Sequence, residues 1–572
     1  MMFTPRYQLR QVLVGITIAF LIVVAYFRNG SSASGVYSLS SSTSTIPRTF
    51  NGKLKLSPLH SFWNTTLGLM YEYEPKFDVT NPIHVVDHLE SMGGVRTKEA
   101  LLARSVISEK VIEELKKKHA GMLKNLPKSL PYVNGKNGIV FIGGGKFSWL
   151  TYVSLMGLRN TGSKLPVEVI LPSYADYEEE VNFCTEILPR LNAVCVVIPE
   201  VMGPGALSLQ SKKTKFQNYQ FKSLALMVSS FQNVLLLDSD NIPLANPDSL
   251  FESSMFAQNG MVTWPDFWER TTSPVFYDVA GINVDESKRI RSEAYSVFQD
   301  TASKVSKNRD EGADFGDNKE KDIPYHDFSG TIPNPSTESG QFLINKKTHS
   351  ETLLLSMYYN LYGPKLYYKL LSLGEPGEGD KDTFIAAAHV LNQKYYQVHT
   401  KVRSLGYWDK GDFNGVAMMH RDPIADYKDF QKFIRPNLNK YKPMDEQISI
   451  LKTLDDKYFS ANNKLPYYFM HCNFPKLDPL VLMGIDKLYD KGSNRLNYRM
   501  YSEFEYIFGT GEQTEYSDSG VKIDFELQQW RNIRFTLCEE KLYFRHFKDI
   551  SYDNLCEFAN NQVKWLSSTS KQ

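Results

Sequence analysis

Residues Asn233 to Asn241 read NVLLLDSDN, and this stretch does more than any other to decide the fold. Its apolar part, Val234 to Leu237, is typical of a short strand that is buried on both faces. The strand ends abruptly in two carboxylates, Asp238 and Asp240, at positions i and i+2. A buried strand that ends in polar side chains indicates the ligand-binding edge of an open α/β sheet.

Strands and helices alternate along the chain before this stretch. Apolar runs predict strands at Ile139 to Gly145, Leu165 to Pro172 and Ala193 to Pro199. Apolar residues at helical spacing predict a helix from Phe221 to Val228. The alternation predicts an α/β fold with a doubly wound, mostly parallel sheet, because its strands must be covered on both faces.

Asp238 and Asp240 are the first candidates for chemistry. Two hard oxygen ligands at this spacing can hold an octahedral divalent cation such as Mn²⁺ or Mg²⁺ and leave positions open for water and a diphosphate. A solvated turn is the plain alternative. The place of both carboxylates directly after a buried strand favours the metal site.

The composition fits a large globular enzyme. The 572 residues carry 65 Lys and Arg against 64 Asp and Glu, which gives a net charge of +1. A nucleic-acid binder would carry a basic surface, so no nucleic-acid partner is expected. A mean hydropathy of −0.35 excludes a protein with many membrane spans.

The N-terminus is expected to anchor the chain in a membrane. The run from Val12 to Phe27 is uncharged, with Arg6 and Arg10 before it and Arg28 after it. We therefore expect a single-pass type II signal anchor at residues 12–28, with a cytosolic tail at 1–11 and a lumenal catalytic domain. A cleaved signal peptide is the alternative, but no small-residue cleavage site follows the run.

The sequence after the anchor predicts a stem, a neck and a catalytic domain. Eight of the fifteen residues from Ser31 to Thr45 are serines, which predicts a flexible lumenal stem over 29–50. We expect a helical neck at 51–133 and one catalytic domain at 134–572, with a surface insertion loop at 303–321. This layout is typical of an enzyme in the Golgi membrane, although a tethered receptor ectodomain could share it.

An oxidising lumen predicts disulfides and glycans. Nearness in the sequence favours the pairs Cys184–Cys195 and Cys538–Cys556, with Cys472 left over. Asn64 begins an Asn-Thr-Thr acceptor sequon and is the expected glycosylation site.

Several longer stretches resemble a known family. The segment FKSLALMVSSFQNVLLLDSDNIPLANPDSLF, from Phe221 to Phe251, looks like the metal-binding segment of nucleotide-sugar glycosyltransferases with the GT-A fold. Over residues 130–480 the chain is similar to fungal Golgi α-mannosyltransferases of the Mnn type, with the motifs WPDFWERTTSPVFYDVAG, STESGQFLINKKTH and GEGDKDTFIAAAHVL in order. The resemblance implies a GT-A-like fold and a retaining transfer of mannose from GDP-mannose.

The resemblance also implies which residues bind the donor. Asp238 and Asp240 would hold Mn²⁺, or another divalent cation, against the diphosphate of GDP-mannose. The segment YYFMHCNFPKLDP resembles the late H-x-x-G-x-x-K-P-W segment of retaining GT-A enzymes, so His471 would be a third metal ligand. Phe474 departs from the glycine of that pattern, and His420 is the rival ligand. The donor-binding candidates are Gly143, Gly144, Lys215, Lys222 and Lys476.

The remaining candidates would surround the sugars. Glu338 could be the nucleophile or stabilise an oxocarbenium-like centre, and Gln341 could act on the same face of the sugar. Asp382 is a further catalytic candidate and Asp380 is expected to bind the acceptor, although both could simply cap the helix that follows. The aromatic candidates for stacking on sugars are Trp264, Trp268 and Trp408, of which Trp408 is assigned to the acceptor.

The sequence thus predicts a Golgi α-1,2-mannosyltransferase that extends α-mannoside acceptors of N-glycan and cell-wall mannan, alone or in a complex with other mannosyltransferases. One alternative is α-1,3-mannosyl transfer, or transfer from another nucleotide sugar, on the same fold. Another is a catalytically silent mannan-binding subunit of a transferase complex. The intact pair of Asp238 and Asp240 counts against the silent subunit, because a protein without catalysis need not keep it.

Overall fold

The computed structural model describes residues 55–571, apart from 87–94, 213–215, 292–322, 376, 439, 441–443 and 518. The predicted tail, anchor and stem, the insertion loop at 303–321 and Lys215 all lie outside the described residues. Within the described part, no helix is both long and apolar enough to cross a membrane.

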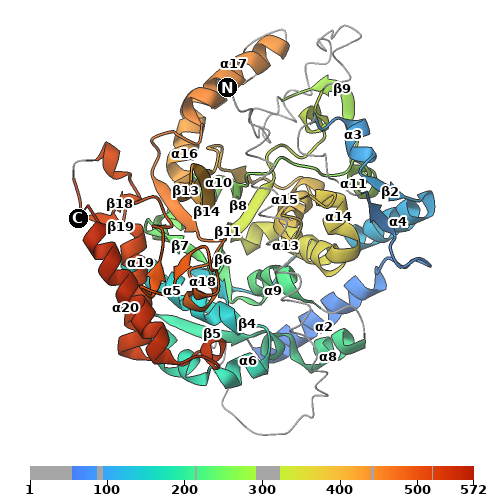
Figure 1. The fold of residues 1–572 in the computed structure, drawn as a ribbon. Helices are drawn as coiled ribbons and strands as arrows, with labels where there is room; N and C mark the ends of the chain where they lie inside the picture. The colour runs from blue at the N-terminus through green and yellow to red at the C-terminus, as the bar shows by residue number, and fades with distance from the viewer. Residues whose placement is uncertain are drawn as a thin grey trace.

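The centre of the molecule is a seven-stranded sheet with the order β12-β8-β11-β6-β3-β4-β5 (Figure 1). Strands β6, β3, β4 and β5 are parallel, as the alternation of strands and helices predicts. Strand β11 is antiparallel to both of its neighbours, β6 and β8, so the sheet is mixed. The strands are β3 (Val133–Ile142), β4 (Val167–Leu171), β5 (Ala193–Val197), β6 (Phe231–Leu237), β8 (Met261–Pro265), β11 (Thr337–Asn345) and β12 (Tyr396–Gln397).

The reversal of β11 has a direct consequence for the site. Gln341 of β11 lies opposite Leu237, the last residue of β6. Because the two strands run in opposite directions, the first half of β11 lies at the edge where β6 ends. The segment from Glu338 to Gln341 therefore lies beside Asp238.

Successive residues of the parallel strands point into two different cores. Val169 and Leu235 belong to the core on one face of the sheet, whereas Ile170 and Leu236 belong to the core on the other. Burial on both faces explains why these strands carry apolar residues at successive positions rather than at alternating ones, with the buried Glu168 of β4 as an exception.

A second, four-stranded sheet has the order β13-β14-β15-β7 and is antiparallel throughout. Its edge strand β7 follows directly after Asp240, so the carboxylate motif lies in the turn between the two sheets. His471 ends β15 and pairs with Asn241 of β7, which brings the imidazole to this turn. The strands are β7 (Asn241–Pro243), β13 (Arg403–Asp409), β14 (Asp412–Arg421) and β15 (Tyr467–His471).

The predicted neck is part of the main body. Trp63 and Met70 of α2 and Leu115 of α4 share one core with the sheet residues Ile170 and Leu236. Helix α2 packs against α8, so the helices of this segment pack on the main body of the molecule (Figure 1). The elements here are α2 (Leu56–Glu72), β1 (Ile83–Val85), α3 (Lys98–Leu102), β2 (Ser105–Ile107), α4 (Glu109–Asn125) and α8 (Ile198–Lys212).

Further helices flank the two sheets, and α17 extends away from them at the top of the view (Figure 1). Those before the middle of the chain are α5 (Lys146–Asn160), α6 (Tyr174–Glu179), α7 (Leu188–Arg190), α9 (Phe221–Val228), α10 (Ser254–Asn259) and α11 (Pro274–Ala280). Those after it are α13 (Lys346–Leu361), α14 (Tyr368–Ser372), α15 (Lys381–Val390), α16 (Pro423–Asp429), α17 (Met444–Tyr458), α18 (Pro479–Met483), α19 (Phe525–Arg534) and α20 (Tyr552–Thr569). The short strands are β9 (Asp285–Arg289), β10 (Phe328–Ser329), β16 (Tyr489–Asp490), β17 (Arg495–Leu496), β18 (Glu505–Ile507) and β19 (Lys522–Asp524).

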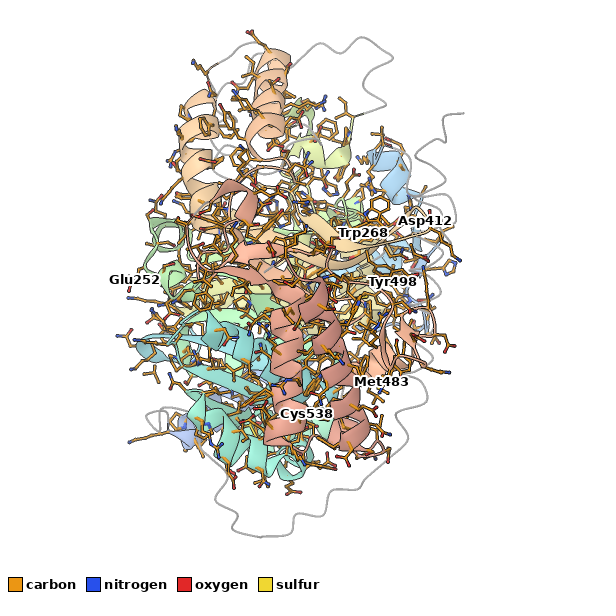
Figure 2. All side chains as sticks on the ribbon, turned by 60° about the vertical axis from the view of Figure 1, so that its left-hand side comes forward. Glu252, Trp268, Asp412, Met483, Tyr498 and Cys538 are labelled. Carbon is orange, nitrogen blue, oxygen red and sulfur yellow. A yellow bond between two sulfur atoms is a disulfide. The ribbon has the colours of Figure 1, made fainter. Side chains whose placement is uncertain are left out.

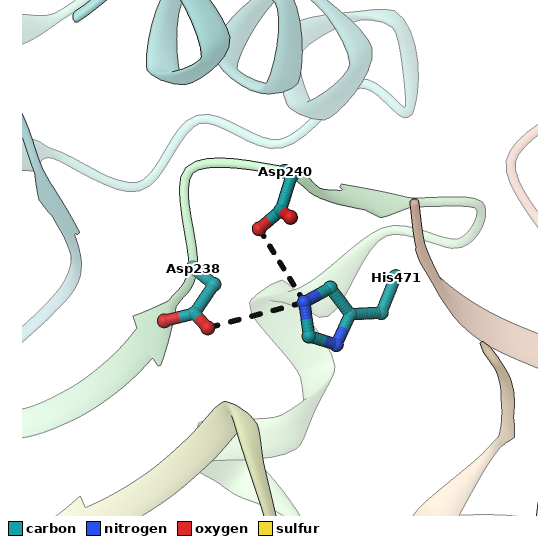
Figure 3. Close-up of side chains that lie close together, drawn as sticks. All are labelled: Asp238, Asp240 and His471. Carbon is teal, nitrogen blue, oxygen red and sulfur yellow. Dashed lines mark ion pairs between the residues drawn. The ribbon is translucent and has the colours of Figure 1, made fainter. Parts of the chain in front are cut away.

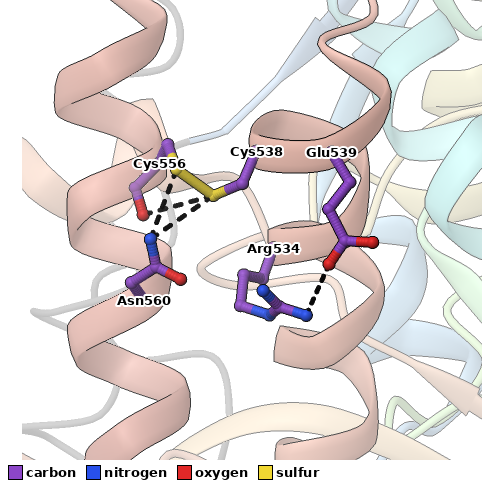
Figure 4. Close-up of a disulfide and its surroundings, with 5 residues drawn as sticks. All are labelled: Arg534, Cys538, Glu539, Cys556 and Asn560. Atoms are coloured by element: carbon purple, nitrogen blue, oxygen red, sulfur yellow. Dashed lines mark hydrogen bonds and ion pairs between the residues drawn. A yellow bond between two sulfur atoms is a disulfide. The ribbon is translucent and has the colours of Figure 1, made fainter.

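Both predicted disulfides form. Cys184–Cys195 joins the turn before α7 to β5, and Cys538–Cys556 joins the segment after α19 to α20 (Figure 4). Cys472 is buried and is the free cysteine among the described residues. The second disulfide closes the helical pair at the C-terminal end of the chain.

Candidate metal and donor site

Asp238, Asp240 and His471 come together at the turn between the two sheets (Figure 3). Each offers one ligand atom, and these atoms all lie within 4.8 Å of one another. The Nε2 atom of His471 is 3.3 Å from an oxygen of Asp240 and 3.9 Å from an oxygen of Asp238. The backbone supports this geometry, because the N–H of Cys472 donates to the carbonyl of Asp240 at 2.9 Å.

The three metal-ligand candidates fit a divalent cation. Two carboxylates and one imidazole provide oxygen and nitrogen ligands of the kind that Mn²⁺ accepts. Three protein ligands leave room for oxygens from water or a phosphate group. The same three side chains are those that the sequence assigns to the metal.

The charges of the cluster are strongly coupled. Burial alone would raise the pKa of Asp240, but Lys476 and His471 together outweigh burial and hold this pKa well below its usual value. Burial would lower the pKa of His471, whereas Asp240 and Glu338 raise it to about 10. Without a metal, the carboxylates therefore surround an imidazolium, and a divalent cation can take the place of that positive charge.

Two lysines of the sequence prediction contact the cluster. Lys222, near the start of α9, forms an ion pair with Asp238 at 2.8 Å and donates to the Ser339 hydroxyl at 3.0 Å. Lys476 forms a hydrogen-bonded ion pair with Asp240. These pairs place two partly exposed ammonium groups beside the carboxylates, 12% exposed at Lys222 and 31% at Lys476, where an anionic ligand would gain from both.

Glu338 and Gln341 of β11 lie beside the same cluster. Glu338 lies 3.4 Å from the Nδ1 atom of His471 and accepts a hydrogen bond from the Gly340 N–H at 2.6 Å. Burial raises the pKa of Glu338, but its contact with His471 outweighs burial and keeps the carboxylate ionised at neutral pH. The amide oxygen of Gln341 accepts from Asn241, while its amide nitrogen has no partner among the described residues.

The run Gly143 to Gly145 follows β3 at the edge of the sheet where β6 also ends. Gly144 has a φ of +95°, and a Cβ atom added there would lie 3.1 Å from Asp176. A side chain at this position would therefore crowd Asp176 and strain the backbone. The N–H of Gly144 donates to the Ser148 hydroxyl at 2.8 Å, which fixes the loop before α5.

Asp380 and Asp382, two residues apart, lie in different surroundings. Asp380 is 3.9 Å from Lys222, so it adjoins the cluster, and one of its buried oxygens accepts no hydrogen bond from the described residues. Asp382 pairs with the buried Arg270 at 2.8 Å and accepts from the Thr337 N–H at 3.1 Å. The structure therefore connects Asp380 with the cluster and places Asp382 in a buried ion pair behind β11; neither side chain caps α15.

Three other predicted positions do not join the cluster. Trp408 is 63% exposed at the end of β13 and packs on Phe413. Asn64 is exposed on α2, beside Gly205 of α8. His420 is buried in β14, and neither of its ring nitrogens has a hydrogen-bond partner in the described part of the chain.

The sequence reasoning missed Asp266 and its partner Lys381. Asp266 directly follows the buried strand β8 and binds Lys381 at 2.6 Å. The signal was present, since a carboxylate after an apolar strand is the same pattern that marks Asp238. Tyr219 was also missed, because nothing in its sequence surroundings shows that it lies against Gly379.

Comparison with known proteins identifies the family. A family model described as "Mannosyltransferase putative" matches residues 136–422, about half of the chain. The alpha-1,2-mannosyltransferase MNN23 of Candida albicans is 45% identical over 90% of this chain and 85% of its own length. The chain belongs to this mannosyltransferase family.

Other members of the mannosyltransferase family match almost the whole chain. The alpha-1,2-mannosyltransferase MNN2 of Saccharomyces cerevisiae is 32% identical over 96% of this chain and 91% of its own length. The alpha-1,2-mannosyltransferase MNN22 of Candida albicans is 40% identical over 82% of this chain and 79% of its own. As a member of this mannosyltransferase family, the protein is a glycosyltransferase.

Solved glycosyltransferase structures are far more remote from this mannosyltransferase. The glycosyltransferase GlyE of Streptococcus pneumoniae is 14% identical, with a TM-score of 0.25 over 46% of this chain and 45% of its own. The galactosyltransferase LgtC, solved with donor and acceptor sugar analogues, is 12% identical, with a TM-score of 0.23 over 46% of this chain and 73% of its own.

Proposed function

We propose that the protein is an α-1,2-mannosyltransferase that transfers mannose from GDP-mannose to α-mannoside acceptors of glycoprotein and cell-wall mannan. The observation that supports this most is the joining of Asp238, Asp240 and His471 next to Lys222 and Lys476. The relatives are named alpha-1,2-mannosyltransferases, which supports mannose as the sugar and α-1,2 as the linkage.

The lysines would bind the donor phosphates. Lys476 and Lys222 form ion pairs with Asp240 and Asp238, so each ammonium already lies where a diphosphate oxygen would be stabilised. Asp238, Asp240 and His471 would hold Mn²⁺ or another divalent cation, which when bound would stabilise the negative charge that develops on the departing diphosphate. The loop at Gly143 and Gly144 would let the guanosine approach the backbone.

Glu338 and Gln341 would act at the sugar. An α-linked donor that gives an α-linked product requires retention, by a covalent intermediate or by reaction on the same face. The ionised carboxylate of Glu338 suits a nucleophile or a stabiliser of positive charge on the sugar, but not a proton donor. The unpartnered amide nitrogen of Gln341 could donate to a sugar or leaving-group oxygen.

The test of this function uses the full-length protein in detergent with GDP-mannose, other nucleotide sugars, α-mannoside acceptors and Mn²⁺. Transfer from GDP-mannose alone, with an α-1,2 linkage in the product, is expected. Asp240→Asn should abolish transfer, whereas Asp486→Asn, which changes a 92% exposed carboxylate, should retain it. Absence of transfer from GDP-mannose under every condition would remove the proposal.

We also propose that the protein works in the Golgi membrane as a single-pass type II protein with its catalytic domain in the lumen. The charges before Val12 and the serine-rich run after Arg28 support this topology. In sealed microsomes, added protease should spare the catalytic domain and should digest it once detergent is present. Digestion without detergent would contradict the topology.

A further inference from the structure

The metal cluster belongs to a series of charged side chains, each of which contacts the next. Lys476 contacts Asp240, Asp240 contacts His471, His471 contacts Asp238, Asp238 contacts Lys222, and Lys222 contacts Asp380. In the proposed function the metal ligands and both lysines hold the donor diphosphate, which leaves Asp380 as the one charged group of this series without a role at the diphosphate. The groups that surround Asp380 are therefore candidates for binding a sugar.

Helix α9 and the turn before it present two side chains to the loop 377–380. Tyr219 and Lys222 are three residues apart, which places them on the same side of a helical turn. A Cβ atom added at Gly379 would lie 3.6 Å from the ring of Tyr219, and Asp380 is 3.9 Å from Lys222. The Tyr219 ring is nevertheless 53% exposed.

The turn that carries Tyr219 is firmly held. The side chain of Gln220 donates to the Asn360 carbonyl at 2.6 Å and accepts from the Gln217 N–H at 2.7 Å. Gln220 itself is buried. An exposed aromatic ring on a rigid turn is suited to binding, because little conformational entropy is lost when a ligand packs on it.

A second aromatic ring, that of Trp268, lies against the same loop. A Cβ atom added at Gly377 would lie 3.3 Å from the Trp268 ring and 2.7 Å from the Lys381 ammonium. The ion pair of Lys381 with Asp266 at 2.6 Å ties the Trp268 segment to α15. Trp268 lies far from the Cys538 end of the molecule (Figure 2).

Asp380 directly follows Gly379 in this loop and is buried. Its Oδ2 atom lies 3.9 Å from the Lys222 ammonium, too far for a hydrogen bond, and accepts no hydrogen bond from the described residues. A buried acceptor without a donor costs free energy, so a ligand hydroxyl that donates to it would be bound favourably.

We propose that Tyr219, Trp268 and Asp380 form the subsite for the mannose residue of the acceptor. Aromatic rings pack against the apolar C–H face of a pyranose, and a carboxylate accepts hydrogen bonds from its hydroxyls. We assign the subsite to the acceptor and not to the donor, because Tyr219 is exposed and Trp268 is partly exposed, whereas the metal ligands Asp240 and His471, which would hold the donor diphosphate, are buried. This inference rests on the proposed function.

The test measures the acceptor and donor separately in the full-length protein. With α-mannobiose as the acceptor, Tyr219→Ala and Trp268→Ala should each raise the acceptor KM roughly five- to tenfold, the size expected for the loss of one aromatic contact. The donor KM, and the slow hydrolysis of GDP-mannose without acceptor, should stay within about twofold. Tyr219→Phe should keep the wild-type acceptor KM, because the ring is retained.

Phe508→Ala is the matched control, since Phe508 is also an exposed aromatic residue but lies between β18 and β19. It should leave both KM values unchanged. An unchanged acceptor KM in both alanine variants, or an equal rise in the donor KM, would overturn the subsite.

A failure of the proposed function is distinguished from a failure of the subsite, because in the first case the wild-type protein does not turn over GDP-mannose. In that case, saturation-transfer NMR with α-mannobiose still tests the subsite. Binding by the wild type that is lost in Tyr219→Ala would support it. Absence of binding by the wild type would overturn it.

Discussion

At the scale of single residues, two neighbouring aspartates show how position decides role. Asp380 and Asp382 stand at the start of α15, two residues apart, and the sequence treats them almost alike. Asp380 lies against Lys222 at the cluster, whereas Asp382 is bound by Arg270, Ser336 and Thr337 behind β11. Asp382 therefore supports β11, and only Asp380 reaches the line of charges that leads to the metal group.

The substitution Asp382→Asn should act mainly on stability. It would leave the guanidinium of Arg270, which is wholly buried, without its charge partner. Loss of one partner of a buried ion pair costs roughly 3–5 kcal/mol. Urea unfolding should show this loss, while the folded fraction should keep a kcat within a few fold of the wild type.

Asp426→Asn is a useful comparison, because Asp426 is also buried and accepts hydrogen bonds from Tyr396 and Thr400 away from β11. It should lower stability without any specific effect on transfer. If Asp382→Asn instead abolished turnover in a protein of normal stability, Asp382 would have a catalytic role.

The protonation of His471 predicts how metal binding depends on pH. The pKa of this imidazole is raised to about 10 in the absence of metal, so at neutral pH the ring carries a proton that a metal must displace. Mn²⁺ affinity should therefore rise about tenfold per pH unit below that value, with release of close to one proton.

Calorimetry in buffers of different ionisation enthalpy would count this proton. In His471→Asn the release should disappear, while the weaker remaining binding should lose most of its pH dependence. Metal binding by the wild type without proton release would contradict the assignment of His471 as a ligand.

At the scale of secondary structure, the segment after His471 is held by the C-terminal part of the chain. Asp478 caps α18 by accepting from the Leu480 N–H at 3.0 Å, and its other oxygen lies 2.6 Å from the His546 ring. Phe547, the next residue, packs edge-on against Trp149 of α5. The loop that carries Lys476 is thus fixed to the elements that flank the glycine run.

His546→Ala should consequently weaken donor binding without touching the metal group. We expect the donor KM to rise several-fold because Lys476 loses its orientation, with Mn²⁺ affinity and the acceptor KM within about twofold. His546→Gln, which can still donate to Asp478, should recover much of the loss. Steady-state kinetics with each substrate varied in turn would separate these effects, and a change in acceptor KM alone would contradict this reading.

Much of the central sheet could be predicted from the sequence, and the reason is physical. Strands β4, β5 and β6 are buried on both faces, so most of their residues are apolar and they stand out in the sequence, although β4 also buries Glu168. The direction of β11 could not be predicted, because an apolar strand reads the same in either direction. Its reversal is nevertheless what brings Glu338 to Asp238.

Contacts between segments far apart in the sequence could not be predicted either. The segment with His471 could be matched to a motif, but the approach of Tyr219 to Gly379 or of Asp478 to His546 has no local signal. The disulfides were predictable, since each joins cysteines fewer than twenty residues apart. The neck could not be placed, because an amphipathic helix such as α4 indicates that it packs on something but not on what.

At the scale of the whole molecule, the metal should stabilise the fold. Its candidate ligands come from both sheets, so the ligand set exists only in the folded protein. At a free Mn²⁺ concentration about 100 times Kd, binding would add about 2.7 kcal/mol, or roughly 2 °C in Tm for a chain of this size. Calorimetric scans with Mn²⁺ and with a chelator should show this difference, and Asp240→Asn should remove it.

The turn from Asp238 to Asn241 also makes the site sensitive to how the two sheets are seated on each other. Asp238 extends from the central sheet, while His471 belongs to the second sheet and reaches the turn only through its pairing with Asn241. A slide of one sheet past the other by a single residue would separate the imidazole from both carboxylates. The affinity for metal therefore depends on the relative position of the two sheets. Substitutions of residues buried between the sheets should lower the metal affinity before they unfold the chain.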